Sequence, residues 1–255
     1  MKRLGRLSAV GFLVLVAGAN AGTLVVSGDS NLGNAIDGDN GMPVIAGNEV
    51  FFANLLGAGS NVLFQRTTNT DATEVGSENA IETYYGGLGD SLWAGPPTTA
   101  SLAGMNLFIG FLPDVAYTTA QATAISNFLA GGGTVLLTAE FSDFDATAVA
   151  NVNALLALLG SGMVVDTSNV DEGIRDATGA QIASNGLTTG VTGFGYAATN
   201  TVSGGTPLFY TTGGVPFMEC SGCAAVVGSV PEPGAGLLLL GGLSGLLVLR
   251  RRARR

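Results

Sequence analysis

Three acidic side chains that follow an apolar run are the first candidates for chemistry. The run 134–138 has the composition of a buried strand, and Glu140, Asp143 and Asp145 come directly after it. Ligands of open α/β sheets bind outside the carboxyl ends of the strands. These carboxylates could therefore hold a metal ion or a sugar, with Asp29 joining from the end of the first strand. Asp143 or Asp145 could instead cap the next helix, a role that does not account for Glu140.

An early loop carries a second group of oxygen ligands. Five Asp and Asn side chains occur there: Asp29, Asn31, Asp37, Asp39 and Asn40. Oxygen-rich loops suit calcium, and the calcium candidates are Asp37 and Asp39. The spacing departs from an EF-hand loop, because the required order fails after Asp39 and no glutamate follows at the right distance. The alternative is a turn-rich loop whose side chains bond their own backbone.

The only two cysteines form a CxxC pair, Cys220 and Cys223, and the chain has no histidine. Catalysis by Ser-His-Asp or Cys-His groups and zinc sites with histidine ligands are therefore excluded. In an oxidising compartment the pair is expected to form a structural disulfide. A redox role is the alternative, although such pairs usually open a helix after an early strand.

Aromatic residues mark a Gly-rich segment: Tyr84, Tyr85 and Trp93. Exposed aromatic rings there could stack on the sugar rings of an exopolysaccharide. Such side chains also pin long loops to a core.

Apolar runs and helical periodicities predict the elements that position these residues. The principal strands are expected at 23–26, 61–64, 106–110 and 134–138, with helices at 48–56, 118–130 and 146–159. Shorter strands are expected at 163–165, 207–210, 215–218 and 224–227, and 67–97 reads as a long surface excursion. Strands that alternate with helices imply an α/β, three-layer domain with a mostly parallel sheet.

The beginning of the chain has the three parts of a secretory signal. Lys2, Arg3 and Arg6 precede an apolar stretch, and Ala19-Asn20-Ala21 matches a small-x-small cleavage site before Gly22. We therefore expect a signal peptide over 1–21, signal peptidase and the secretion machinery as partners, and an exported protein. A first transmembrane anchor is the alternative.

The last 26 residues contain three elements in order. Val230-Pro231-Glu232-Pro233 precedes an uncharged Gly/Leu-rich stretch, 234–249, which is close to membrane-spanning length. Arg250, Arg251 and Arg252 open a basic terminus that would stay on the cytoplasmic side. The pattern predicts a transmembrane helix at 234–249. An ordinary tail anchor is the alternative to a processed signal.

These three elements resemble the PEP-CTERM sorting signal of Gram-negative bacteria that make exopolysaccharide; the same tail is also labelled an ice-binding protein C-terminal domain. The resemblance covers 230–255 and implies an exosortase as partner, with Pro231-Glu232-Pro233 as its recognition site. It further implies a membrane-anchored precursor and then a location in the outer envelope or outside the cell.

The body, 22–229, is long enough for one core. It keeps two basic residues, Arg66 and Arg175, against 18 acids, a formal net charge of −16. Two arginines among 18 acids cannot neutralise the phosphates of a nucleic acid, so nucleic-acid binding is excluded. It could attract divalent cations, although negative charge also serves solubility.

The segment 128–137, Phe-Leu-Ala-Gly-Gly-Gly-Thr-Val-Leu-Leu, resembles the class I glutamine amidotransferase-like, flavodoxin-like fold. The active members need a cysteine at the turn after the strand and a histidine, and this chain has neither. The resemblance therefore implies a noncatalytic scaffold or ligand-binding body without a cofactor. The alternatives are a carboxylate-dependent hydrolase of envelope polysaccharide, with Glu140 and a nearby Asp as acid and base, and a calcium-dependent adhesion module.

Overall fold

A computed structural model describes residues 22–68 and 70–223. The predicted signal peptide (1–21), the strand at 224–227 and the sorting signal with its transmembrane helix (230–255) lie outside these residues. Within the described ranges, every helix is too short or too polar to cross a bilayer.

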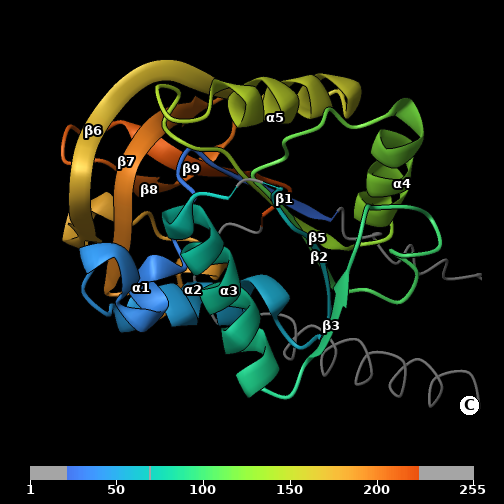
Figure 1. The fold of residues 1–255 in the computed structure, drawn as a ribbon, viewed down its shortest axis with the longest axis horizontal. Helices are drawn as coiled ribbons and strands as arrows, with labels where there is room; N and C mark the ends of the chain where they lie inside the picture. The colour runs from blue at the N-terminus through green and yellow to red at the C-terminus, as the bar shows by residue number, and fades with distance from the viewer. Residues whose placement is uncertain (1–21, 69, 224–255) are drawn as a thin grey trace, which may run out of the picture.

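Seven strands form the main sheet (Figure 1). They are β1 (Thr23–Ser27), β2 (Asn61–Gln65), β3 (Ser91–Ala94), β4 (Leu107–Phe111), β5 (Thr134–Thr138), β8 (Thr206–Tyr210) and β9 (Pro216–Ser221). Their spatial order is β3-β2-β4-β5-β1-β9-β8. The first five are parallel, and β9 and β8 extend the sheet antiparallel. The predicted α/β class with a mostly parallel sheet is therefore confirmed.

Strand β1 lies beside β5, not beside β2. In the flavodoxin order, 2-1-3-4-5, the first strand of the chain lies inside the sheet next to the second. Here β1 lies on the far side of β5 from β4, so it is the last of the five parallel strands in the sheet although it is the first in the chain.

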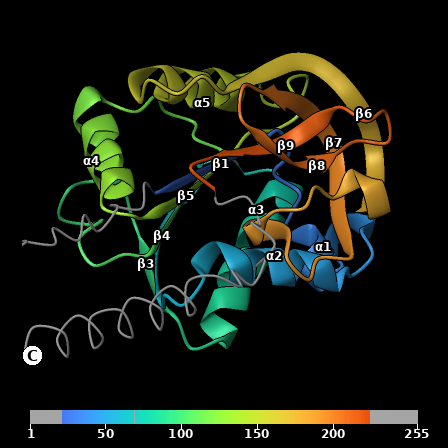
Figure 2. The ribbon, with the colours of Figure 1, turned by 180° about the vertical axis from the view of Figure 1, so that it is seen from behind.

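Alternate residues of the strands point to two different cores. Val25, Val62 and Ile109 face the side covered by α2 (Ala46–Leu56) and α3 (Ala72–Gly87). Leu24, Leu63 and Phe108 face the side covered by α4 (Thr119–Ala130) and α5 (Ala146–Leu158). Both faces are buried, which is why the strands are nearly continuous apolar runs. Helices therefore cover both faces of the sheet, as Figures 1 and 2 show.

Capping residues set where the helices on the second face begin. Thr118 and Gln121 form a capping box at the start of α4. The Asp145 carboxylate accepts hydrogen bonds from the backbone N–H groups of Thr147 and Ala148 at the start of α5. The predicted capping role therefore belongs to Asp145, not to Asp143.

A second sheet consists of two long antiparallel strands, β6 (Val164–Thr178) and β7 (Gly193–Ser203). It bends over the carboxyl ends of the parallel strands (Figure 1). The backbone N–H of Asn200 donates to Gly28 O at 3.0 Å, just after β1 ends. Three short strands were expected in the last third besides 224–227. The described part of the last third has four strands, β6 to β9. The sequence did not predict the full length of β6, because most of it is polar, or β7, because it has no strong apolar pattern.

The prediction of a surface excursion over 67–97 is wrong, because the segment contains α3 and β3. Asp71 caps the helix by accepting from the Thr73 N–H, and Ile81 and Tyr85 enter the core. The Tyr85 hydroxyl donates to Phe52 O at 2.9 Å. Tyr85 therefore anchors a helix, whereas Trp93 on the edge strand β3 is 57% exposed.

The remaining helical segments are short. They are α1 (Asn34–Asp37) and three 3₁₀ turns, η1 (Asp39–Gly41), η2 (Gly179–Gln181) and η3 (Gly186–Thr188). Helix α1 packs against α3 at Gly33, where a Cβ atom would lie 1.9 Å from Ser77 O. The absence of a side chain at Gly33 therefore permits this close approach.

Both ends of the described body meet at the amino edge of the parallel sheet. Strand β1 starts there, and the antiparallel β9 finishes there, with Leu24 opposite Ser221. Cys220 and Cys223 form a disulfide at this end of β9, as expected from the CxxC pair.

Candidate functional site

Two buried carboxyl groups come together at the opposite, carboxyl edge of the sheet. Asp29 follows β1 and Glu140 follows β5, and both are almost fully buried. Ser30 Oγ donates to Glu140 Oε2. Asn31 Nδ2 lies 3.0 Å from Asp29 Oδ1 and 3.3 Å from Glu140 Oε2, so it bridges the two groups. Glu140 and Asp29 therefore lie at the same place on the sheet edge, where the sequence predicted that Asp29 could join Glu140.

Backbone donors fix the same pair. The Ala197 N–H of β7 donates to Asp29 Oδ2 at 2.8 Å, and the Phe141 N–H donates to Glu140 Oε1 at 2.9 Å. Burial raises the pKa of Asp29 to about 7, against hydrogen bonds from Asn31 and Ala197 that lower it. Burial, followed by the charge of Asp29, raises the pKa of Glu140 well above its ordinary value. The pair therefore holds a proton more readily than two exposed carboxyl groups would.

A cavity of about 670 Å³ opens beside Glu140. Twelve residues line it: Asn31, Asn40, Asp71, Thr73, Glu74, Glu140, Asp143, Phe144, Gly173, Ile174, Ala197 and Ala198. Four carry a carboxyl group, and none carries a positive charge. The volume lies in the range of small-molecule sites, and the position matches that of ligands in open α/β sheets.

Glu74 in the first turn of α3 is the least satisfied of these acids. Glu74 is only 6% exposed, and its Oε2 atom has no hydrogen-bond partner among the described residues. Burial raises the pKa of Glu74 to about 7, and the nearby charges of Asp145, Asp71 and Asp114 add to the shift. Most buried polar atoms in proteins have a partner, so Oε2 is an acceptor in need of a donor.

Two non-glycine residues with left-handed backbone also line the cavity. Asn40 has φ 52° and Ala198 has φ 41°. Asn tolerates this conformation, whereas for Ala it costs about 1–2 kcal/mol. Ala198 follows directly on Ala197, whose N–H holds Asp29, so the strained position belongs to the wall of the site.

The other predicted site residues are divided between the cavity and the surface. Asp143 lines the cavity. Asp37 and Asp39 are exposed, and their carboxylates accept from Asp39 N at 3.1 Å and Asn40 N at 2.7 Å. The early loop therefore makes the local Asx-type bonds of the alternative interpretation. Within residues 22–68 and 70–223, no three Asp, Glu, His or Cys side chains are placed to hold a metal ion together.

Sequence reasoning missed Asp71, Thr73 and Glu74. The signal was present, because an N-cap Asp followed three residues later by Glu is a helix-start pattern. Asp71 and Glu74 have this spacing. Recognising it would have placed a carboxylate in the first turn of a helix that follows β2, at the same sheet edge as Glu140.

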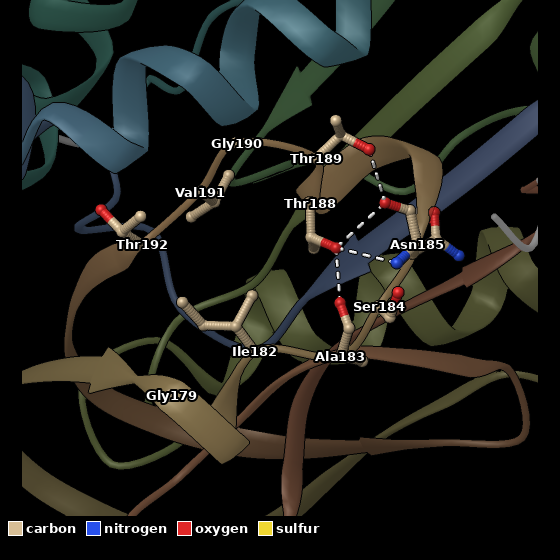
Figure 3. A pocket seen from close by; sticks show the side chains of 10 residues that line it. All are labelled: Gly179, Ile182, Ala183, Ser184, Asn185, Thr188, Thr189, Gly190, Val191 and Thr192. Carbon is tan, nitrogen blue, oxygen red and sulfur yellow. Dashed lines mark hydrogen bonds between the residues drawn. The ribbon is translucent and has the colours of Figure 1, made fainter. Parts of the chain in front are cut away.

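Another cavity, of about 550 Å³, lies around η3 and contains no charged side chain (Figure 3). Its polar groups bond one another: Thr188 Oγ1 donates to Ala183 O and Asn185 O, and Thr189 Oγ1 donates to Asn185 O. These bonds stabilise a turn, so we regard the cavity beside Glu140 as the candidate site.

Comparisons with known proteins give no match: no family model fits the chain, and no curated protein or solved structure is significantly similar to it. The resemblance of 230–255 to a sorting signal therefore stays a prediction from its residues.

Proposed function

We propose that the chain is an exported protein of the cell envelope or extracellular matrix whose body binds a ligand and does not catalyse a reaction. A secretory signal over 1–21 and sorting through Pro231-Glu232-Pro233 by an exosortase bring it there. The membrane holds the precursor through 234–249, and the surroundings of the mature protein include exopolysaccharide.

One observation carries the ligand-binding part of the proposal. The cavity beside Glu140 lies at the carboxyl edge of the sheet, whereas Gly22 and Cys223 lie at the amino edge. A tail that continues from Cys223 would leave the body on the side away from the cavity. The point at which the chain leaves the described body therefore does not cover the cavity.

We further propose that the body is a flavodoxin-like domain whose strand order is circularly permuted. Read as β2, β3, β4, β5 and β1, the parallel strands have the order 2-1-3-4-5. The helices on both faces agree with this interpretation. A domain of this kind supplies a rigid edge on which loops can carry a binding site.

The second candidate is a carboxylate-dependent hydrolase of envelope polysaccharide. It is favoured by the presence of Glu74 and Glu140 in one cavity, because the raised pKa of both carboxyl groups suits a general acid. The many hydrogen bonds that hold Glu140 suit a structural group equally well.

The first experiment is intact mass and cell fractionation of the native protein. We expect a mature chain that begins at Gly22, ends near Pro231 or Pro233, and is found in the outer envelope or medium. A chain that still carries Arg255 in the inner membrane would contradict sorting and make the tail an ordinary anchor.

A substitution separates binding from hydrolysis. The Glu140→Gln and Glu74→Gln variants would be assayed with exopolysaccharide from the same host, beside Glu82→Gln, a residue of α3 that pairs with Arg66 outside the lining of the cavity. We expect the unsubstituted chain to release no new reducing ends. Release that disappears in the first two variants but persists in Glu82→Gln would refute the noncatalytic proposal.

A further inference from the structure

We infer that the cavity beside Glu140 takes an organic cation, a primary ammonium group carried on a ring-sized body. The inference rests on the proposed ligand-binding role and names the chemistry of the ligand. Three observations lead to it: the charge of the lining, the unsatisfied Glu74 carboxyl group, and an exposed aromatic ring at the cavity.

The lining has only one sign of charge. Asp71, Glu74, Glu140 and Asp143 contribute carboxyl groups, and none of the twelve lining residues is Lys or Arg. The two arginines of the body are already paired with acids outside the lining: Arg66 pairs with Glu82, and Arg175, which bonds Ile174 O next to the cavity, pairs with Asp171 at 3.1 Å. A cavity lined in this way concentrates cations and repels anions.

Glu74 shows which kind of cation fits. Its Oε2 atom is buried without a donor among the described residues, although the side chain lines the cavity. An ammonium group supplies positive charge as well as N–H donors, so, bound against the Glu74 side chain, it would offset the charge of a carboxylate whose Oε2 atom no described donor reaches. A neutral hydroxyl group would supply a donor without the charge that four carboxyl groups favour.

The geometry favours an organic cation over a metal ion. Calcium needs six to eight oxygen ligands around one point, and the described residues contain no group of three acidic side chains in such an arrangement. Glu140 and Asp29 are also engaged by donors of the protein itself. One ammonium group needs only two or three acceptors.

Apolar side chains supply a surface for the rest of the ligand. Phe144 is 71% exposed and packs against the buried Phe141, with ring centroids 5.0 Å apart. Ile174 on β6 is 40% exposed. Both line the cavity. An aromatic face attracts cations and the apolar face of a ring, and the volume of about 670 Å³ admits a ring-sized body.

The test is calorimetric titration of the purified full chain with two matched pairs at low salt. Phenethylamine is compared with 2-phenylethanol, and glucosamine with glucose, so that each pair keeps the ring and changes the charge. We expect the amine to bind at least tenfold more tightly than the alcohol in one pair or both, and the pair with the larger ratio identifies the ring type.

Two variants locate the binding. We expect Glu74→Gln to weaken amine binding about tenfold, and Phe144→Ala to weaken it several-fold at a position too exposed to disturb folding. Glu82→Gln, with the same charge change on the same helix, serves as the control and should leave binding unchanged.

Four results would overturn the inference. They are absence of amine binding, equal affinity for amine and neutral partner, unchanged affinity in Glu74→Gln, and displacement of the amine by an equal concentration of calcium chloride. None of these results bears on where the protein is found. Failure of the inference and failure of sorting are therefore distinguished by fractionation.

Discussion

Replacing Glu74 by Gln should stabilise the protein at neutral and alkaline pH and leave it unchanged at acidic pH. The cause is the buried carboxyl group, which has no hydrogen-bond donor for Oε2 among the described residues. Burial raises the pKa of Glu74 from 4.5 to about 7, and the charges of Asp145, Asp71 and Asp114 act in the same direction. The folded protein therefore disfavours the ionised form that an exposed glutamate would adopt.

The sign of the pH dependence follows from proton binding. Between pH 4.5 and about 7 the folded state binds more protons at Glu74 than the unfolded state does. The contribution of Glu74 to stability is therefore most favourable below pH 4.5 and is lost as the pH rises through this window. The full shift corresponds to about 3.4 kcal/mol. Solvent in the neighbouring cavity screens the charge, so we expect about 1–2 kcal/mol.

Urea unfolding followed by far-UV circular dichroism at pH 4.5, 6 and 8 measures this difference. At pH 8 the Glu74→Gln variant should gain about 1–2 kcal/mol, or about 2–8 °C in melting temperature. The Glu74→Gln variant should retain part of the pH slope, because burial also raises the pKa of Asp29 and of Glu78 to about 7. The control is Glu82→Gln, which makes the same change on the same helix. Because the carboxylate of Glu82 already pairs with Arg66, this variant should gain no stability at pH 8.

The reasoning would be refuted if Glu74→Gln were less stable than the wild type at pH 8, or if the difference did not change between pH 4.5 and pH 8. The first result would mean that the carboxylate has a favourable partner. The second would mean that the effect comes from packing and not from charge.

Three further changes test the packing, the disulfide and a helix cap. Gly33→Ala should cost about 2–3 kcal/mol in urea unfolding, because the new Cβ would lie 1.9 Å from Ser77 O; Gly87→Ala, with nothing within 4 Å, should be neutral or stabilising. Reduction of the disulfide should cost about 2 kcal/mol by the loop-entropy relation, measured as a lower melting temperature with dithiothreitol, and no shift would contradict it. Asp145→Ala should cost about 1 kcal/mol by removing the cap of α5, and an unchanged urea midpoint would contradict that role.

The strands and helices between β4 and α5 could be predicted from the sequence, because burial there repeats at the period of the element. Strand β5 was expected at 134–138 and is found at Thr134–Thr138. Asp145 was one of the two capping residues expected before the helix at 146–159, and it is the one that caps α5. Both faces of these strands are covered, so the apolar runs had little ambiguity.

Helix α3 could not be predicted in the same way, because its buried side includes carboxyl groups. Glu74 and Glu78 are both buried and lie one turn apart. A pattern analysis counts them as solvent-facing and therefore assigns the segment to a loop. Glu74 is a candidate site residue because it is an acidic side chain in a buried position at the cavity. A rule that looks for apolar periodicity misses such a residue.

The same conflict limits what could be predicted of the site. Glu140 and Asp29 could be placed together because both follow parallel strands. Their closeness also requires that β1 and β5 are adjacent in the sheet. This adjacency depends on the strand order, which local sequence patterns do not determine. Ala197 reaches the pair from β7, about 170 residues after Asp29, and no local signal announces that contact.

The arrangement of the two sheet edges connects the parts of the proposal. Strand β1 spans the sheet from the end where Gly22 and Cys223 meet to the end where Asp29 begins the site, roughly 15 Å at the rise of a strand. Because β9 returns antiparallel, chain entry and exit share one edge, and all βα loops of the parallel strands remain at the other. A body tethered through residues after Cys223 would thus present its acidic cavity away from the tether. In the proposed membrane-held precursor, the exit of the described body at Cys223 and the acidic cavity lie at opposite ends of the parallel strands, so that the exit itself does not cover the cavity.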